Sequence, residues 1–351
     1  MTEAWRELVD LERLGRWMDA QGLAPGAPIK QPTLLTGGTQ NLLLRFARGG
    51  RGFVLRRPPK NPRVDGNETM RREARVLAAL ADSRVPHARL IASCAEADVL
   101  GAGFYLMEPV DGYGPTAGLP PHVAAQPLWC HRMGLSLAEA IADLGTLNVQ
   151  DLGLADFSRT EGWLQRQAPR WHRQLLGYAE YAGWPGVDGL PGVQAVAHWL
   201  EAHTPAKCRI GIVHGDYHFG NVMFRHDAPE LAAIVDWELA SLGDPLLDLG
   251  WLIATWPDAR GRSVVDKLEV QPWAGFPEPA ELATAYAARS GRDLSDLRWY
   301  TVLACYKLGI ILEGTHARAH AGKAPMQIGI ELHAAACRLI ERAQGTMAGT
   351  A

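Results

Sequence analysis

Residues 209–256 read RIGIVHGDYHFGNVMFRHDAPELAAIVDWELASLGDPLLDLGWLIATW, and the rest of the chain is best interpreted from this segment. It opens with a β-branched run, Ile210–Val213, which a polar loop, His214–Asn221, follows at once. Two further short apolar runs, Val222–Phe224 and Ala232–Trp237, are separated by a turn. Runs of this length and composition predict a strand, then a loop with ionisable side chains, and then a hairpin.

The hairpin geometry indicates where three oxygen-bearing side chains lie. Asp216 and Asn221 stand at the mouth of the loop, and Asp236 ends the returning strand. A strand that returns in a hairpin comes back to the edge from which it left, so we expect the three side chains to converge. Carboxylate and amide oxygens suit Mg²⁺. The sequence therefore predicts Asn221 and Asp236 as magnesium ligands and leaves Asp216 for another role.

The motif HGDYHFGN, followed by IVDWE, resembles the catalytic loop and metal-binding segment of the aminoglycoside phosphotransferase family, distant relatives of protein kinases. The resemblance implies an α+β, bilobal, protein-kinase-like fold with ATP and Mg²⁺ as cofactors. It places an antiparallel sheet and a helix in an N-terminal nucleotide-binding lobe, residues 1–110. A mostly helical catalytic and acceptor-binding lobe follows, residues 111–351. By the same resemblance Asp216 orients the acceptor hydroxyl and accepts its proton, and His218 touches the phosphate or the acceptor.

The apolar run after Gly243 predicts a buried helix that begins at Asp244-Pro245. Asp248 is an acid within that run and needs a partner. The resemblance implies that Asp248 braces the catalytic loop through hydrogen bonds and that His214 supports the same loop. The alternative is an acid on the wet face of the helix.

A glycine-rich loop, residues 36–41, lies between two extended runs near the N-terminus. Glycine lets backbone N–H groups approach phosphate oxygens, although a plain hairpin turn fits the same letters. The resemblance places Gly37, Gly38, Thr39 and Asn41 over the nucleotide phosphates.

Arg56 ends the third predicted strand, where kinase-like enzymes usually have a lysine that grips the α and β phosphates. Arginine keeps the charge and offers a bidentate fork. The resemblance makes Glu73, on a helix predicted over 69–81, the partner that holds this fork. The alternatives are a solvent-facing Arg56 and a surface charge at Glu73.

Two more strands are predicted at Val85–Ala92 and Ala102–Val110. The second leads into a segment that resembles the hinge between the lobes, whose backbone groups meet adenine. The residues assigned to that contact are Met107, Glu108 and Val110.

The composition fits a protein of two domains. The chain has 351 residues, a net charge of −3 and 47% hydrophobic residues. This balance argues against nucleic acid and anionic membranes as partners. The five cysteines are far apart and odd in number, which argues against a disulfide framework and a zinc site. The N-terminus has no long apolar core, so we expect a cytoplasmic protein.

The C-terminal half reads as helical over 128–147, 163–178, 193–202 and 297–320. Residues 158–178 carry four arginines and two tryptophans, a composition that suits a non-cationic acceptor, although a solvated helix face fits as well. Glu313 and Arg318 resemble an E-G-x-x-x-R stretch in the branch of the family found fused or adjacent to acyl-CoA dehydrogenases. We assign them to the acceptor, with a structural ion pair as the alternative.

We therefore predict an ATP- and Mg²⁺-dependent small-molecule kinase that moves the γ-phosphate to a hydroxyl group of a small molecule, such as a hydroxyacyl or other non-cationic metabolite. An aminoglycoside O-phosphotransferase is one alternative, because one scaffold serves many acceptors. A catalytically silent nucleotide-binding module is another, motivated by Arg56. A third is a zinc or manganese hydrolase built on His214, Asp216 and His218. The sequence carries no signal of oligomeric state.

Overall fold

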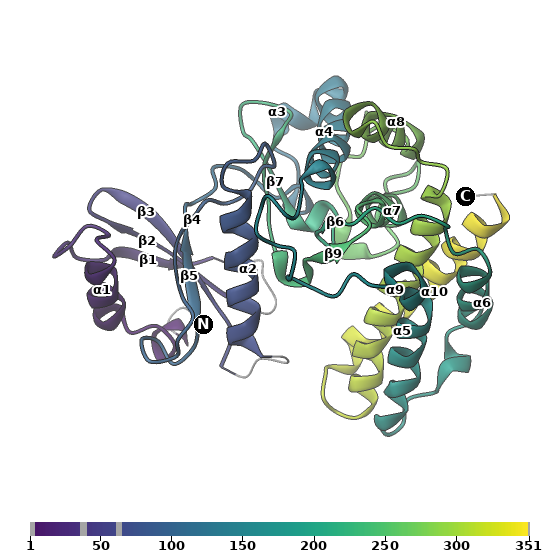
Figure 1. Ribbon diagram of the computed structural model, residues 1–351, viewed down its shortest axis with the longest axis horizontal. Helices are drawn as coiled ribbons and strands as arrows, with labels where there is room; N and C mark the ends of the chain where they lie inside the picture. Colours follow the sequence, from purple (N-terminus) through teal and green to yellow (C-terminus); the bar gives the residue numbers. More distant parts are fainter. Residues whose placement is uncertain (1–3, 36–40, 61–64, 350–351) are drawn as a thin grey trace. The chain divides into compact units, whose positions relative to one another are not determined.

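The computed structural model describes residues 4–35, 41–60 and 65–349, which form two compact units (Figure 1). The division is not a single cut of the chain, because two short segments from the second half group with the N-terminal residues. The first unit comprises Met1–Gly112, Leu152–Leu154 and Ala232–Ala240, and the second comprises Tyr113–Asp151, Ala155–Leu231 and Ser241–Ala351.

The first unit is built on a five-stranded sheet in the order β1-β2-β3-β5-β4, in which each neighbouring pair is antiparallel. Its strands are β1 (Lys30–Leu34), β2 (Leu42–Arg48), β3 (Arg51–Arg57), β4 (Leu90–Cys94) and β5 (Phe104–Met107). Gly49 and Gly50 join β2 to β3 with φ of 56° and 80°, a backbone that glycine adopts without strain. The predicted antiparallel N-terminal sheet is confirmed.

Two helices, α1 (Leu11–Ala20) and α2 (Gly66–Leu80), complete this unit. The pleat of β3 sends alternate side chains to them: Leu55 joins the apolar cluster that includes Leu14 of α1, whereas Arg56 contacts α2. The apolar residues from Trp5 to Met18 fall at helical spacing, which predicts one helix there. The structure instead has a short 3-10 turn, η1 (Ala4–Glu7), and starts α1 afresh because the Asp10 side chain accepts from two backbone N–H groups.

The predicted strand at Val85–Ala92 is displaced, since β4 begins only at Leu90. Pro86 has no N–H to give to a ladder, and its carbonyl accepts from Ile234 instead. The strand predicted at Ala102–Val110 is shorter, because β5 ends at Met107, two residues before Pro109. A proline therefore limits the strand in both places.

The second unit is mostly helical, with a small antiparallel pair of strands, β6 and β9. Its helices are α3 (Pro121–Ala124), α4 (Pro127–Thr146), α5 (Trp163–Gly177), α6 (Val193–Ala202), α7 (Leu246–Thr255), α8 (Pro279–Ser290), α9 (Leu297–His320) and α10 (Met326–Ala348). The short strands are β6 (Gly211–Val213), β7 (Val222–Phe224), β8 (Leu231–Ile234), whose last three residues group with the first unit, and β9 (Ser241–Gly243). Helices α9 and α10 lie side by side (Figure 1).

Helix α7 begins at Leu246, one residue later than predicted, and Pro245 takes the cap position. Asp244 still caps it, because its Oδ1 accepts from the N–H of Leu246 at 3.0 Å. Asp244 also forms an ion pair with Arg292, whose Nη2 lies 2.7 Å from the Asp244 carboxylate. Among the helices that the structure describes, none carries an apolar stretch able to cross a lipid bilayer.

Candidate active site

Arg56 is the centre of the polar cluster in the first unit. Its Nε lies 2.9 Å from Oε2 of Glu73 on α2, and its Nη2 lies 2.6 Å from Oδ1 of Asp236. The Arg56 side chain is 9% exposed and that of Glu73 is 1% exposed. The expected pair of Arg56 and Glu73 is therefore present, and the alternatives of a solvent-facing arginine and a surface glutamate are wrong.

Burial and neighbouring charges shift the pKa values of both members of this pair. Burial alone would lower the pKa of Arg56, but Glu73 and Asp236 outweigh it and raise that pKa well above the ordinary value. Burial raises the pKa of Glu73, and Arg56 opposes this effect. The Tyr105 hydroxyl also donates to Glu73 at 2.7 Å. Two carboxylates thus hold the guanidinium in one orientation.

Asp236 adopts a left-handed backbone, with φ of 65° and ψ of 65°, just before the 3-10 turn η6 (Trp237–Leu239). A non-glycine residue in this region is uncommon and concentrates at functional sites. The carboxylates of Glu73, Asp236 and Glu238 each offer an oxygen within 4.8 Å of the others. Such a set of hard oxygens suits Mg²⁺. Glu238 was not assigned from the sequence, although it stands in the IVDWE motif.

The loop His214–Asn221 lies in the second unit, and two of its side chains contact the Asp216 carboxylate from different sides. His218 Nε2 lies 3.1 Å from Oδ1 of Asp216, and Asn221 Nδ2 donates to Oδ2 at 2.9 Å. His218 Nδ1 accepts from the N–H of Gly220, so its Nε2 carries the hydrogen that faces Asp216. Because Asn221 uses Nδ2 in this way, its Oδ1 is the atom suited to a cation.

Asp216 is an anion at neutral pH. Burial would raise its pKa, but His218, His214 and Lys307 outweigh burial and hold that pKa well below the ordinary value. An acid of this kind is a weak base. Its carboxylate is therefore better suited to orienting a hydroxyl than to removing a proton by itself.

Asp248 fixes the start of the loop, as predicted for it. Its Oδ2 accepts from the N–H of His214 at 2.7 Å and its Oδ1 from the N–H of Gly215 at 2.9 Å. The alternative of a solvated acid is wrong, because Asp248 is 1% exposed. His214 is fully buried, and its Nδ1 accepts from the N–H of Asp216 at 3.3 Å. Gly215 turns the chain between them with φ of 85°, which favours glycine.

Lys307 of α9 is a member of this site that the sequence analysis did not assign. Its Nζ donates to the carbonyl of Gly215 at 3.2 Å and lies 4.7 Å from the ring centroid of Trp251 and 5.4 Å from that of Trp171. Burial lowers the pKa of Lys307 to about 8, and Asp248 and Asp216 oppose that shift. A lysine within an apolar helix was the only sequence feature that could have indicated this role. The sequence could not show its partner, because Gly215 is 92 positions away.

The structure describes only some of the other residues that were assigned to the nucleotide. Gly37, Gly38 and Thr39 lie outside the described residues. Asn41 Nδ2 donates to Glu238 at 3.4 Å. Met107 ends β5, and the N–H of Glu108 donates to the carbonyl of Arg89, so that N–H is engaged before any adenine binds. The adenine contact of Met107, Glu108 and Val110 stays a prediction.

Glu313 and Arg318 lie on α9. Glu313 is 1% exposed and accepts from three N–H donors on other side chains. Arg318 donates to Thr315 at 2.9 Å. Their acceptor-binding role stays a prediction, and the deep burial of Glu313 gives that role no support.

The model of the phosphotransferase enzyme family, APH, matches residues 32–300. The chain belongs to this family. A crystal structure described as a "putative aminoglycoside phosphotransferase" from Ralstonia eutropha superposes with a TM-score of 0.77 at 28% identity, covering 95% of this chain and 98% of that one. The predicted family and the bilobal kinase-like fold are confirmed.

Curated relatives of this phosphotransferase-family chain carry dehydrogenase names. Acyl-CoA dehydrogenase family member 11 of Gallus gallus is 28% identical over 82% of this chain and 36% of its own length. Family member 10 of Mus musculus is 26% identical over 78% of this chain and 25% of its own length. The chain thus spans about a third or less of these relatives, and the predicted likeness to the dehydrogenase-associated branch is confirmed.

A further solved structure shares the fold alone. It is a ternary complex of the aminoglycoside phosphotransferase APH(4)-Ia with AMP-PNP and hygromycin B, which superposes with a TM-score of 0.58 at 14% identity and covers 92% of this chain.

Proposed function

We propose that this chain is an ATP- and Mg²⁺-dependent kinase that transfers the γ-phosphate to a hydroxyl group of a small, non-cationic molecule. The observation that carries the proposal is the Asp216 carboxylate, held ionised between His218 and Asn221 in a chain of the phosphotransferase enzyme family. An anion fixed in this way accepts a hydrogen bond from a hydroxyl and aligns its oxygen for attack on phosphorus.

The nucleotide is assigned to the residues around Arg56. Two carboxylates fix its guanidinium, so its remaining N–H groups are pre-oriented for phosphate oxygens. We assign Mg²⁺ to Asn221 and Asp236, with Glu238 as a further oxygen donor near Asp236. When bound, the ion neutralises charge on the phosphates.

In the reaction the acceptor oxygen forms a bond to the γ-phosphorus while the bond to the β-phosphate oxygen breaks and ADP leaves. Asp216 receives the hydroxyl proton as that bond forms. His218 donates a hydrogen bond to Asp216 and fixes the carboxylate plane. The largest contribution of these side chains is orientation, because a weakly basic carboxylate gives little driving force for proton removal.

The charge around Asp216 bears on the acceptor. Lys307 contacts the loop that carries Asp216. The positive charge of Arg170 on α5 lowers the pKa of Lys307 further. Such groups oppose a polycationic aminoglycoside and favour an uncharged or anionic molecule. We therefore assign a hydroxyacyl compound or another non-cationic alcohol as the acceptor class.

A substrate panel tests the proposal. The full chain is incubated with MgATP and one of four compound classes: hydroxyacyl compounds, neutral alcohols, amino alcohols and aminoglycosides. ADP is measured by a coupled assay and the product by mass spectrometry. We expect ADP and a phosphorylated product with hydroxyacyl compounds or neutral alcohols. A preference for aminoglycosides would overturn the acceptor class, and MgATP binding without transfer to any compound would favour the silent module.

A further inference from the structure

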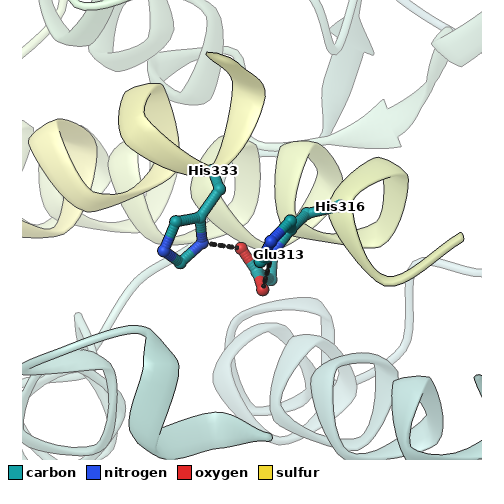
Figure 2. A group of neighbouring side chains, drawn as sticks. All are labelled: Glu313, His316 and His333. Atoms are coloured by element: carbon teal, nitrogen blue, oxygen red, sulfur yellow. Dashed lines mark hydrogen bonds and ion pairs between the residues drawn. The ribbon is translucent and has the colours of Figure 1, made fainter. Parts of the chain in front are cut away.

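A second polar cluster lies between α9 and α10, and it consists of Glu313, His316 and His333 (Figure 2). Oε1 of Glu313 lies 2.9 Å from Nδ1 of His316, and Oε2 lies 2.7 Å from Nδ1 of His333. Figure 2 shows the carboxylate between the two imidazole rings. One ligand atom from each residue lies within 4.8 Å of those of the other two, so a single ion could contact all three.

The cluster is deeply placed, with side-chain exposures of 1% for Glu313, 7% for His316 and 26% for His333. A carboxylate at this depth is costly unless its charge is balanced. Trp184 Nε1 donates to it at 2.7 Å, and Nδ1 of His316 and Nδ1 of His333 also contact it. A cation held by all three residues would supply that charge, and His333 is the most exposed of the three side chains.

We propose that Glu313, His316 and His333 bind one divalent transition-metal ion, for which Zn²⁺ is the best fit. Two imidazole nitrogens and a carboxylate form a donor set that zinc and its neighbours accept, whereas Mg²⁺ prefers oxygen ligands alone. Zinc–ligand bonds are near 2 Å long, about half of the 4.8 Å within which the ligand atoms lie. One ion placed between the three atoms could therefore bind all of them. The site would join α9 to α10 and leave a coordination position for water.

The outer partners of both imidazoles suit this role. Nε2 of His316 lies 3.1 Å from Nε2 of His320, and Nε2 of His333 lies 3.6 Å from Sγ of Cys337. When Nδ1 binds a metal, Nε2 carries the hydrogen, and each of these neighbours is then an acceptor for it. With the hydrogen on Nε2, each Nδ1 is the atom that can bind the ion.

Zinc titration of the chelator-treated full chain tests the proposal, with excess MgCl₂ present and a chromophoric chelator as competitor. We expect one zinc ion per wild-type chain. Glu313→Gln and His333→Ala should each weaken zinc binding by about 100-fold or more, because loss of an outer-shell partner alone typically costs 10–100-fold. The matched control is His198→Ala, an exposed histidine of α6, which should bind zinc as the wild type does.

Two results would overturn the proposal. One is wild-type zinc binding no tighter than that of His333→Ala. The other is loss of the bound ion in His218→Ala but not in His333→Ala, which would place zinc at the catalytic loop. Circular dichroism checks that each variant folds. The visible absorption of Co²⁺ bound to the wild-type chain reports the nitrogen and oxygen ligands without any substitution, and a Co²⁺ spectrum identical to that of aqueous Co²⁺ would also contradict the site.

Discussion

Asp216 already has hydrogen-bond donors on both carboxylate oxygens, and this arrangement sets what the residue can do. Because its pKa is low, Asp216 stays ionised through the neutral range. We therefore expect no change in turnover near neutral pH from titration of Asp216. The residue was found from the sequence because motif spacing is local. His218 and Asn221 lie within five positions of it, so their contacts follow from the loop itself.

Asp216→Asn should lower turnover by about 10²- to 10⁴-fold, the usual contribution of a positioned acid or base. The amide keeps the shape of the side chain but has no negative charge with which to orient the hydroxyl and receive its proton. MgATP affinity, measured by calorimetry, should stay close to that of the wild type. Asp227→Asn, in an exposed turn, serves as the control. Unchanged turnover in Asp216→Asn would refute the assigned role.

Arg56→Lys should raise the KM for ATP by about 10- to 100-fold, which equals the loss of one charge-assisted hydrogen bond of 1.5–3 kcal/mol. A single ammonium group does not reproduce the fork that contacts Glu73 and Asp236 at once. Steady-state kinetics at saturating acceptor measures the change. A KM equal to that of the wild type would show that the fork is not needed for the nucleotide.

Lys307→Met should remove a pH dependence of stability. The folded-state pKa of Lys307 is about 8 and its ordinary value is 10.5, so between these values the unfolded chain binds more protons. Wild-type stability should therefore rise with pH across this window, and the variant should lack that part of the rise. Urea unfolding at several pH values measures it, with Lys267→Met, an exposed lysine, as control. Parallel curves for wild type and Lys307→Met would contradict the assignment.

At the scale of elements, β6 and α7 position the catalytic loop through Asp248. The hydrophobic run predicted α7 and its depth correctly, because a continuous apolar stretch reports burial. The break before α1 and the late start of β4 were missed. Both depend on single residues, Asp10 and Pro86, which override the apolar pattern around them.

Asp248→Ala should lower the free energy of unfolding by about 1.5–3 kcal/mol, because the N–H groups of His214 and Gly215 lose a charged acceptor. Asp248→Asn retains one acceptor oxygen and should lose less. Urea unfolding followed by tryptophan fluorescence gives both values. Stability equal to the wild type in Asp248→Ala would mean that the loop does not depend on this brace.

At the scale of the whole molecule, the sequence motifs identified the family and the antiparallel sheet, but long-range partners escaped them. Lys307 joins the loop from a distant helix, and Glu313 and His316 meet His333 across a helix pair. Sequence spacing gives no measure of such contacts. The assignment of 232–240 to the first unit also could not be read from chain order.

We propose that Asn221 and Asp236 hold one magnesium ion on the nucleotide phosphates while Asp216 orients the acceptor hydroxyl. A crystal structure of the chain with Mg²⁺ and AMP-PNP tests it most directly. We predict an ion bound by Asn221 Oδ1 and the Asp236 carboxylate, with Arg56 on the phosphates. A nucleotide whose magnesium contacts neither residue would contradict the account.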